Sequence, residues 1–273
     1  MSRIGQRFAK LRATSGKALI CFLTAGDPDI ETTKALALEL EQAGADILEL
    51  GAPFSDPLAD GPSIQASSQR ALKNGTTMSA VLGLVADIRK SSELPLVVMT
   101  YTNPVQRYGL ARFAKDAESA GVDGVIMTDM PPEEADEWKP LADASGLDTI
   151  FLLAPTSPPA RIESVARAAS GFVYCVSRTG VTGAQTDLPE ELQSMLTAIR
   201  AATDKPIVVG FGVSCSEHVR QVCQWADGAV VGSALVNLVA EHSADADLVS
   251  IAGRFVRELK EKGDRSLFPN LGQ

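Results

Sequence analysis

Hydrophobic residues along this chain gather in short runs that alternate with longer amphipathic segments. The apolar runs cover residues 18–23, 45–50, 94–101, 123–127, 148–153, 171–176, 206–209 and 228–231. Helical spacing of apolar residues follows each run, at 30–43, 64–73, 78–91, 110–120, 133–145, 159–170, 188–202, 217–225, 234–240 and 246–260. Continuous apolar strands of this kind are typical of a parallel sheet that is buried on both faces.

Eight strand–helix units fit the size of a (β/α)₈ barrel, the TIM barrel, and we expect residues 1–273 to form one such domain. An extra helix over residues 3–14 is predicted to cover the bottom of the barrel. The segment 234–240 predicts a short extra helix after the eighth strand. A doubly wound open sheet is the alternative, but it favours a G-x-G-x-x-G turn after the first strand, where this chain has T-A-G-D-P at 24–28.

Composition narrows the class of partner. The net charge of -9, the pI of about 4.8 and an aromatic content of 5% argue against nucleic acid and anionic membranes. No apolar run is long enough to cross a bilayer, and the first residues lack the apolar core of a signal peptide. Four separated cysteines are typical of reduced thiols. We therefore expect a cytoplasmic protein with a small-molecule substrate.

Two carboxylates stand out where the second strand runs into a loop rich in Pro and Gly. Glu49 lies near the end of the apolar strand, where burial disfavours the charged form and raises the pKa. Asp60 lies in the polar loop and is expected to ionise more easily. Two carboxylates whose surroundings separate their pKa values are candidates for an acid/base pair. Their position supports this interpretation, because catalysis in barrels occurs at the carboxyl ends of the strands. The alternative is a buried, hydrogen-bonded Glu and an ordinary turn Asp.

Aromatic residues and glycines lie at the same predicted rim. Phe22, Tyr101 and Tyr174 are candidates for an apolar pocket, although ordinary core packing is the alternative for each. Glycine-rich turns follow the last three strands, at 177–183, 210–214 and 232–233. Barrels commonly bind phosphate in the loops after strands seven and eight, so these turns predict a phosphate site.

Other catalytic chemistries find less support. Cys215, His218 and Cys223 fit no zinc spacing, and Cys223 is expected to be buried, so no metal site is predicted. Neither His218 nor His242 falls at a strand end, which disfavours histidine-based acid/base catalysis. Aldolases and isomerases with phosphate sites often use a Schiff-base lysine or a metal, but no lysine ends a predicted strand here.

Several motifs together carry a family resemblance. The stretch 48–65, L-E-L-G-A-P-F-S-D-P-L-A-D-G-P-S-I-Q, is similar to the signature of the tryptophan synthase alpha chain family. The resemblance extends over nearly the whole chain and includes the segments 22–28, 99–105, 129–134, 177–183 and 210–213. Cys21, Ala52 and the Met127–Thr128 pair are not the commonest residues at their positions, and Ala52 bears on pocket shape.

The resemblance implies a lyase that cleaves indole-3-glycerol phosphate to indole and D-glyceraldehyde 3-phosphate by a retro-aldol reaction, in L-tryptophan biosynthesis. It makes Glu49 the proton shuttle and Asp60 the group that faces the indole N–H. It implies no metal and no organic cofactor, since the protonated indole accepts the bonding electrons. The substrate-binding residues that it implies are Phe22, Met99, Tyr101, Tyr174, Thr182, Gly183, Phe211, Gly212, Gly232 and Ser233, of which Gly212, Gly232 and Ser233 hold the phosphate.

The resemblance also implies a partner, the tryptophan synthase beta chain, which carries pyridoxal phosphate, in an α₂β₂ heterotetramer. The long loops 53–62 and 179–188 are suited to closing over the site, and we hypothesise that the partner docks on this rim and favours the closed loops. A stand-alone lyase that releases free indole is the alternative. A non-catalytic activating subunit would be expected to lack one of the two carboxylates, and both are present.

Overall fold

The sheet is built from parallel strands only. The computed structural model describes residues 1–176, 189–210 and 212–261. Within them the strands form one nine-stranded sheet in the order β5-β4-β3-β2-β1-β9-β8-β7-β6, and every pairing is parallel. The strands are β1 Ala18–Thr24, β2 Ile47–Gly51, β3 Leu96–Thr100, β4 Gly124–Met127, β5 Asp148–Ile150, β6 Leu152–Leu153, β7 Val173–Val176, β8 Ile207–Gly210 and β9 Gly228–Val231.

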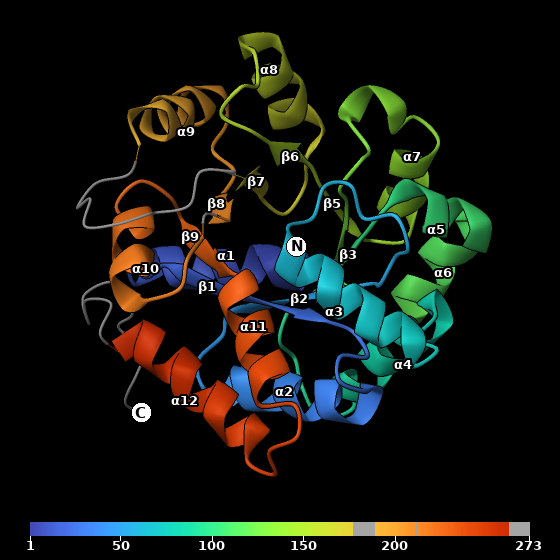
Figure 1. Cartoon of the computed structure of the whole chain (residues 1–273). Helices are drawn as coiled ribbons and strands as arrows, with labels where there is room; N and C mark the ends of the chain where they lie inside the picture. Colours follow the sequence, from blue (N-terminus) through green and yellow to red (C-terminus); the bar gives the residue numbers. More distant parts are fainter. Residues whose placement is uncertain (177–188, 211, 262–273) are drawn as a thin grey trace.

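The sheet closes into a barrel at its fifth position. β5 and β6 stand at opposite ends of the strand order, yet only Phe151 separates them in the chain. The Phe151 carbonyl accepts the Tyr174 N–H at 3.3 Å and continues the ladder across this break. The predicted fifth strand, 148–153, is therefore present as two pieces, and the eight predicted strand positions and the (β/α)₈ fold are confirmed (Figure 1).

Helices surround the barrel in the predicted order. They are α1 Arg3–Ala13, α2 Ile30–Gln42, α3 Pro62–Lys73, α4 Met78–Arg89, α5 Thr102–Tyr108, α6 Leu110–Ala120, α7 Trp138–Ala144, α8 Pro159–Ala168, α9 Glu190–Ala202, α10 Ser216–Cys223, α11 Ser233–Glu241 and α12 Leu248–Glu261, with a 3₁₀ turn η1 at Pro132–Glu134. No helix within the described ranges has the length and apolar character needed to span a membrane.

Two helical segments differ from the prediction. The segment 133–145 was expected to be one helix but is divided into η1 and the shorter α7. The sequence analysis predicted no helix at α5. Its first residue, Thr102, donates its N–H and its hydroxyl to Asp129 Oδ1 at 2.7 and 2.8 Å. Because that acceptor lies 27 residues away in sequence, local patterns do not reveal this start of a helix.

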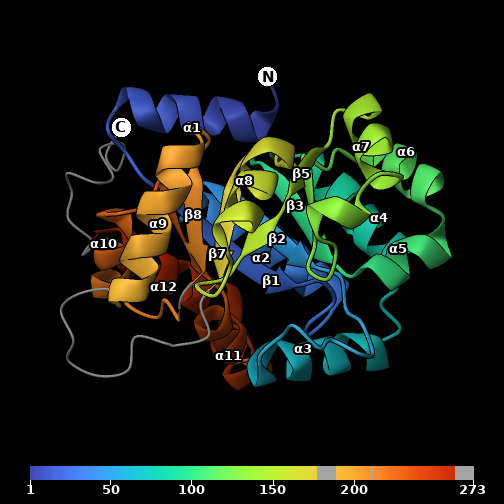
Figure 2. The same ribbon diagram turned by 90° about the horizontal axis from the view of Figure 1, so that it is seen from above.

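The N-terminal helix α1 covers the bottom of the barrel, as predicted. Figure 2 shows α1 across one end of the barrel and α3 and α11 at the opposite end. Ile4, Phe8 and Leu11 on α1 are buried in the cluster that fills the barrel interior. The Phe8 ring lies 5.9 Å from that of Phe172 at the base of β7. This layer seals the lower end and leaves the carboxyl ends of the strands for chemistry.

Asp46, just before β2, ties both terminal helices to the barrel. Its side chain is buried and accepts the Leu19 N–H of β1 at 2.8 Å. Arg7 of α1 and Lys260 of α12 lie 2.8 and 3.0 Å from its two oxygens. A buried carboxylate is stable when cations and hydrogen-bond donors surround it, and Asp46 has both.

Candidate active site

Glu49 points into the barrel from the middle of β2. It is paired in register with Phe22 on β1 and with Val97 on β3. Its side chain is fully buried, and neither carboxyl oxygen has a hydrogen-bond partner among the described residues. Burial without a partner raises its pKa to about 8. The carboxyl group therefore holds a proton at neutral pH, and no residue of the described part of the chain hydrogen-bonds to it.

Asp60 lies in the loop between β2 and α3 and is half-buried. Burial raises its pKa to about 6, and a hydrogen bond from the Tyr101 hydroxyl acts in the opposite direction. The loop is held locally: the Ala59 N–H donates to the Tyr101 hydroxyl at 3.0 Å, and the rings of Phe54 and Tyr101 lie 5.2 Å apart. The two pKa values are separated, as predicted, and between them Glu49 is protonated while Asp60 is ionised.

Two aromatic rings lie against glycines near this pair. A Cβ added to Gly51 would lie 2.5 Å from Cζ of Phe22, and a Cβ added to Gly210 would lie 2.6 Å from the hydroxyl oxygen of Tyr174. Both rings therefore need a glycine at the end of the adjacent strand. The sequence analysis did not single out Gly51 as a pocket residue and placed Gly210 only in a phosphate turn. A glycine that ends an apolar strand was the available signal.

Tyr174 faces the site from β7. It is buried, and its pKa is raised well above the ordinary value, first by burial and then by the nearby charge of Glu49. Met99 on β3 is paired with Gly51 and packs against the interior cluster. The structure thus brings together Glu49, Phe22, Met99 and Tyr174 inside the barrel, while Tyr101 is the N-cap of α5 at the rim.

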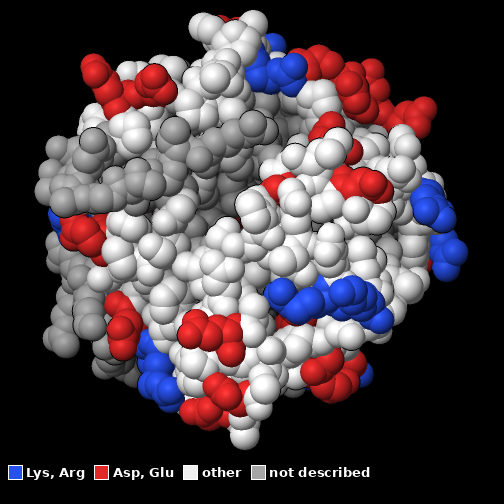
Figure 3. Space-filling model, in the orientation of Figure 1, with Lys and Arg blue, Asp and Glu red and all other residues white. Residues whose placement is uncertain are grey.

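Gly232 and Ser233 begin helix α11 at the same end of the barrel. Gly232 is the N-cap, no side chain caps the helix, and its first turn carries no acidic residue. Gly212, after β8, has a φ of 50°, which favours glycine. Unfilled N–H groups at a helix start are suited to an anion. In Figure 3 few blue Lys and Arg side chains lie around the central hollow among the residues described.

Three predicted substrate-binding residues, Thr182, Gly183 and Phe211, lie outside the described residues, as do the whole of the turn 177–183 and of the loop 179–188. The structure brings no group of three or more His, Cys, Asp or Glu side chains into metal-binding distance in the described ranges. Cys223 is buried, as predicted, and burial raises the pKa of its thiol to about 12.

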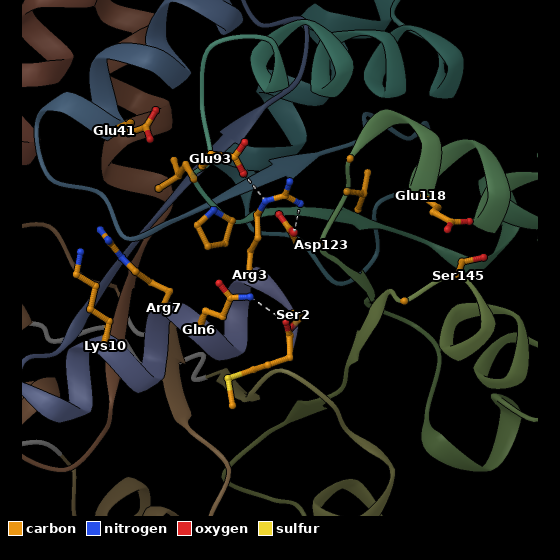
Figure 4. Close-up of a pocket in the computed structure, with 16 residues that line it drawn as sticks. Ser2, Arg3, Gln6, Arg7, Lys10, Glu41, Glu93, Glu118, Asp123 and Ser145 are labelled. Carbon is orange, nitrogen blue, oxygen red and sulfur yellow. Dashed lines mark hydrogen bonds and ion pairs between the residues drawn. The ribbon is translucent and has the colours of Figure 1, made fainter.

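A polar cleft of about 810 Å³ lies at the opposite end, beside α1. Figure 4 shows Arg3 between Glu93 and Asp123, and Arg3 contacts them at 2.7 and 3.1 Å. These charges neutralise one another and join α1 to the strand ends below. The cleft is separated from Glu49 by the apolar floor of the barrel, and we assign it a structural role.

The fold and this rim place the chain in the class of (β/α)₈-barrel enzymes. The family model for the tryptophan synthase alpha chain matches residues 8–262. The tryptophan synthase alpha chain of Citrifermentans bemidjiense is 53% identical over 268 residues, which cover 97% of this chain and 100% of that protein. The chain therefore belongs to the tryptophan synthase alpha chain family, and it is a lyase.

Solved structures of tryptophan synthase alpha chains are similar to this chain over nearly its whole length. The tryptophan synthase alpha subunit of Legionella pneumophila superposes with a TM-score of 0.89 at 37% identity, over 98% of this chain and 99% of that one. A chain of the tryptophan synthase α₂β₂ complex of Pyrococcus furiosus has a TM-score of 0.84 at 40% identity, over 89% of this chain and 97% of that one.

Proposed function

We propose that this chain cleaves indole-3-glycerol phosphate to indole and D-glyceraldehyde 3-phosphate, as the alpha subunit of tryptophan synthase. One observation carries the proposal within this family: Glu49, buried without a hydrogen-bond partner among the described residues, has a pKa of about 8, and Asp60, whose charge acts with that of Glu49 on Tyr174, has a pKa of about 6. A group protonated at neutral pH and a group ionised at the same pH are what this retro-aldol reaction needs.

The proton moves in a closed cycle. Glu49 donates its proton to the indole ring carbon that bears the side chain, and positive charge develops at the ring nitrogen. The Asp60 carboxylate, facing the ring N–H, stabilises that charge. The bond between the ring and the side chain then breaks, its electrons restore the indole, and the Glu49 carboxylate removes the side-chain hydroxyl proton as the aldehyde forms. Glu49 ends the cycle protonated, so no external acid is consumed.

The residues around Glu49 are proposed to bind the substrate and to exclude water from the reaction. Phe22, Met99 and Tyr174 form apolar walls suited to a flat indole ring, and the burial of Phe22 and Tyr174 keeps water from Glu49. Gly212 and the start of α11 are placed to receive the phosphate through N–H groups. Thr182, Gly183 and Phe211 keep their proposed substrate-binding roles. The proposed reaction needs no metal or organic cofactor in this chain.

We also propose the tryptophan synthase beta chain as the partner, in an α₂β₂ heterotetramer, with pyridoxal phosphate held by the partner. The relative in the P. furiosus complex supports this assembly. Leu58, 90% exposed at the tip of the loop that carries Asp60, is an apolar contact available to it. A cytoplasmic location is proposed with it, supported by free cysteines at 21, 175, 215 and 223.

Indole release from indole-3-glycerol phosphate tests the proposal, with the wild-type chain and Glu49→Gln, each with and without a beta chain. Slow turnover alone, strong activation by the partner and loss of activity in Glu49→Gln are expected. Fast turnover without any partner effect would instead establish the stand-alone lyase. Absence of indole in every condition would overturn the proposed reaction.

A further inference from the structure

Helix α3, which follows the loop that carries Asp60, has little apolar contact with the barrel. Its buried side chains are small and belong to Ser67, Ser68 and Ala71, whereas the next helix, α4, buries five aliphatic residues. Figure 2 shows α3 at the end of the barrel opposite α1. Because the packing of an apolar face normally docks a helix, α3 depends on polar contacts for its position.

A two-point ion pair between Arg70 and Asp27 is the charged contact among them. Nε and Nη2 of Arg70 donate to the two carboxyl oxygens of Asp27 at 2.8 and 2.7 Å. Asp27, in the turn after β1, is only 4% exposed. Paired bonds of this kind fix the direction of both side chains as well as their distance. Nearby, the Thr24 hydroxyl lies 2.6 Å from the buried hydroxyl of Ser67, so α3 is attached to the turn 24–28 at two levels.

The turn 24–28 is itself fixed to the barrel. The Ala25 N–H donates to the Gly51 carbonyl of β2 at 2.9 Å. The Gly26 N–H donates to the Thr33 hydroxyl of α2 at 3.1 Å. Since both neighbouring elements hold this turn, the ion pair ties α3 to a rigid part of the molecule.

The position of α3 is passed on to Asp60 by the first turn of the helix. Gln65 donates its side-chain N–H to the Asp60 carbonyl at 2.8 Å and its backbone N–H to the Gly61 carbonyl at 3.0 Å. A displacement of α3 therefore moves the main chain of Asp60. We propose that Arg70 is a positioning residue, which holds α3 through Asp27 and thereby sets the position of the Asp60 carboxylate.

The catalytic meaning of this inference rests on the proposed function, because Asp60 is the group assigned to the indole N–H. The attachment of α3 does not depend on that assignment. It can be followed in the ligand-free chain, since the Ala59 N–H, which donates to the Tyr101 hydroxyl at 3.0 Å, lies in the same loop. The Ala52 N–H at the other end of the loop donates to the Met99 carbonyl at 2.8 Å and serves as an internal reference.

The first test is amide hydrogen exchange, measured by NMR on the full, ligand-free chain. Arg70→Gln removes the ion pair, and we expect it to speed exchange at Ala59 about 10-fold and to leave Ala52 unchanged. Lys73→Gln removes an exposed charge from the same helix and is the matched control, with no change at either amide. Thermal unfolding checks that each variant folds, and Arg70→Lys replaces Arg70→Gln in both tests if the latter does not.

The second test is the turnover number for indole release. Arg70→Gln is expected to lower kcat about 10-fold. Arg70→Lys keeps the charge without the two-point geometry and should recover part of the loss. In the Asp60→Asn background, Arg70→Gln is expected to lower kcat no further, because its effect passes through the Asp60 carboxylate.

Three results would overturn the inference. One is unchanged exchange at Ala59 in Arg70→Gln. Another is an equal increase at Ala52 and Ala59, which indicates a general loss of stability. The third is an equal loss of kcat with and without the Asp60 carboxylate. Absence of indole from the wild-type chain would overturn the proposed function and leave the exchange result intact, so the two failures are distinguishable.

Discussion

Phe22 and Glu49 are register partners on the neighbouring parallel strands β1 and β2. Side chains paired in this way point to the same face of a sheet, so an aromatic ring stands beside the carboxyl group inside the barrel. The ring offers no hydrogen-bond donor to the carboxylate and shields it from water. This neighbour accounts for part of the burial that raises the pKa of Glu49 to about 8.

The raised pKa of Glu49 makes stability depend on pH. The folded state keeps the Glu49 proton up to about pH 8, whereas the unfolded chain releases it near the ordinary value of 4.5. The contribution of this group is therefore present below about pH 4.5 and is lost as the pH rises through about 8, by roughly 5 kcal/mol. Urea unfolding should show Glu49→Gln more stable than wild type at pH 9. The exposed Glu118→Gln is the control, and equal gains in both variants would contradict the explanation.

Activity should follow a bell-shaped pH profile. Below about pH 6 Asp60 is protonated and no longer stabilises the positive indole nitrogen, and above about pH 8 Glu49 has lost the proton that it must donate. Asp60→Asn should lower kcat/KM by about 10²–10³-fold and abolish the acidic limb. Indole release measured from pH 5 to pH 10 checks both expectations. Survival of the acidic limb in Asp60→Asn would assign that limb to another group.

Gly51 should tolerate no side chain while Phe22 is present. A Cβ at residue 51 would meet the Phe22 ring at 2.5 Å, so Gly51→Ala displaces the ring into the substrate pocket. We expect a destabilisation of about 1–3 kcal/mol and a clear rise in KM. Phe22→Leu, which shortens the opposing side chain, should recover part of the stability of Gly51→Ala. Gly83→Ala in α4, where a Cβ meets nothing within 4 Å, is the control and should not lower stability.

Asp46→Asn should be among the most destabilising single-atom changes in the chain. The amide cannot neutralise Arg7 and Lys260, and both cations lose the charge of the buried carboxylate that they contact. The expected loss is about 3–5 kcal/mol in the free energy of unfolding, measured with urea. Asp87→Asn breaks only an exposed pair with Lys90 and should leave stability unchanged. Equal effects of the two substitutions would show that the burial of Asp46 has no energetic weight.

The fold was predictable because its signals are local. Apolar runs gave every strand position, and the spacing of Ile4, Phe8 and Leu11 is consistent with a helix that covers the barrel. Helix α5 was missed because its cap comes from Asp129, a contact fixed only by the closed sheet. Short-range patterns carry no information about such a contact.

The sequence predicted which residues lie in the candidate site, but not which hydrogen bonds they make. A lone acid in the apolar run 45–50 predicted the buried Glu49 and the direction of its pKa shift. Tyr101 was expected only to line the pocket. Its hydroxyl instead holds Ala59, which lies 42 residues away in sequence, so the role of this hydroxyl depends on the three-dimensional arrangement.

Asp46 also bears on how the molecule assembles as it is synthesised. Leu19 and Asp46 leave the ribosome early, but Lys260 lies 214 residues later than Asp46. Until α12 arrives, the carboxylate has Arg7 as its cation but not Lys260. Contacts between such distant residues are reached late and slow the overall rate of folding. In the nascent barrel, Asp46 therefore gains its second ion pair, with Lys260, only when the last helix docks beside the first strands.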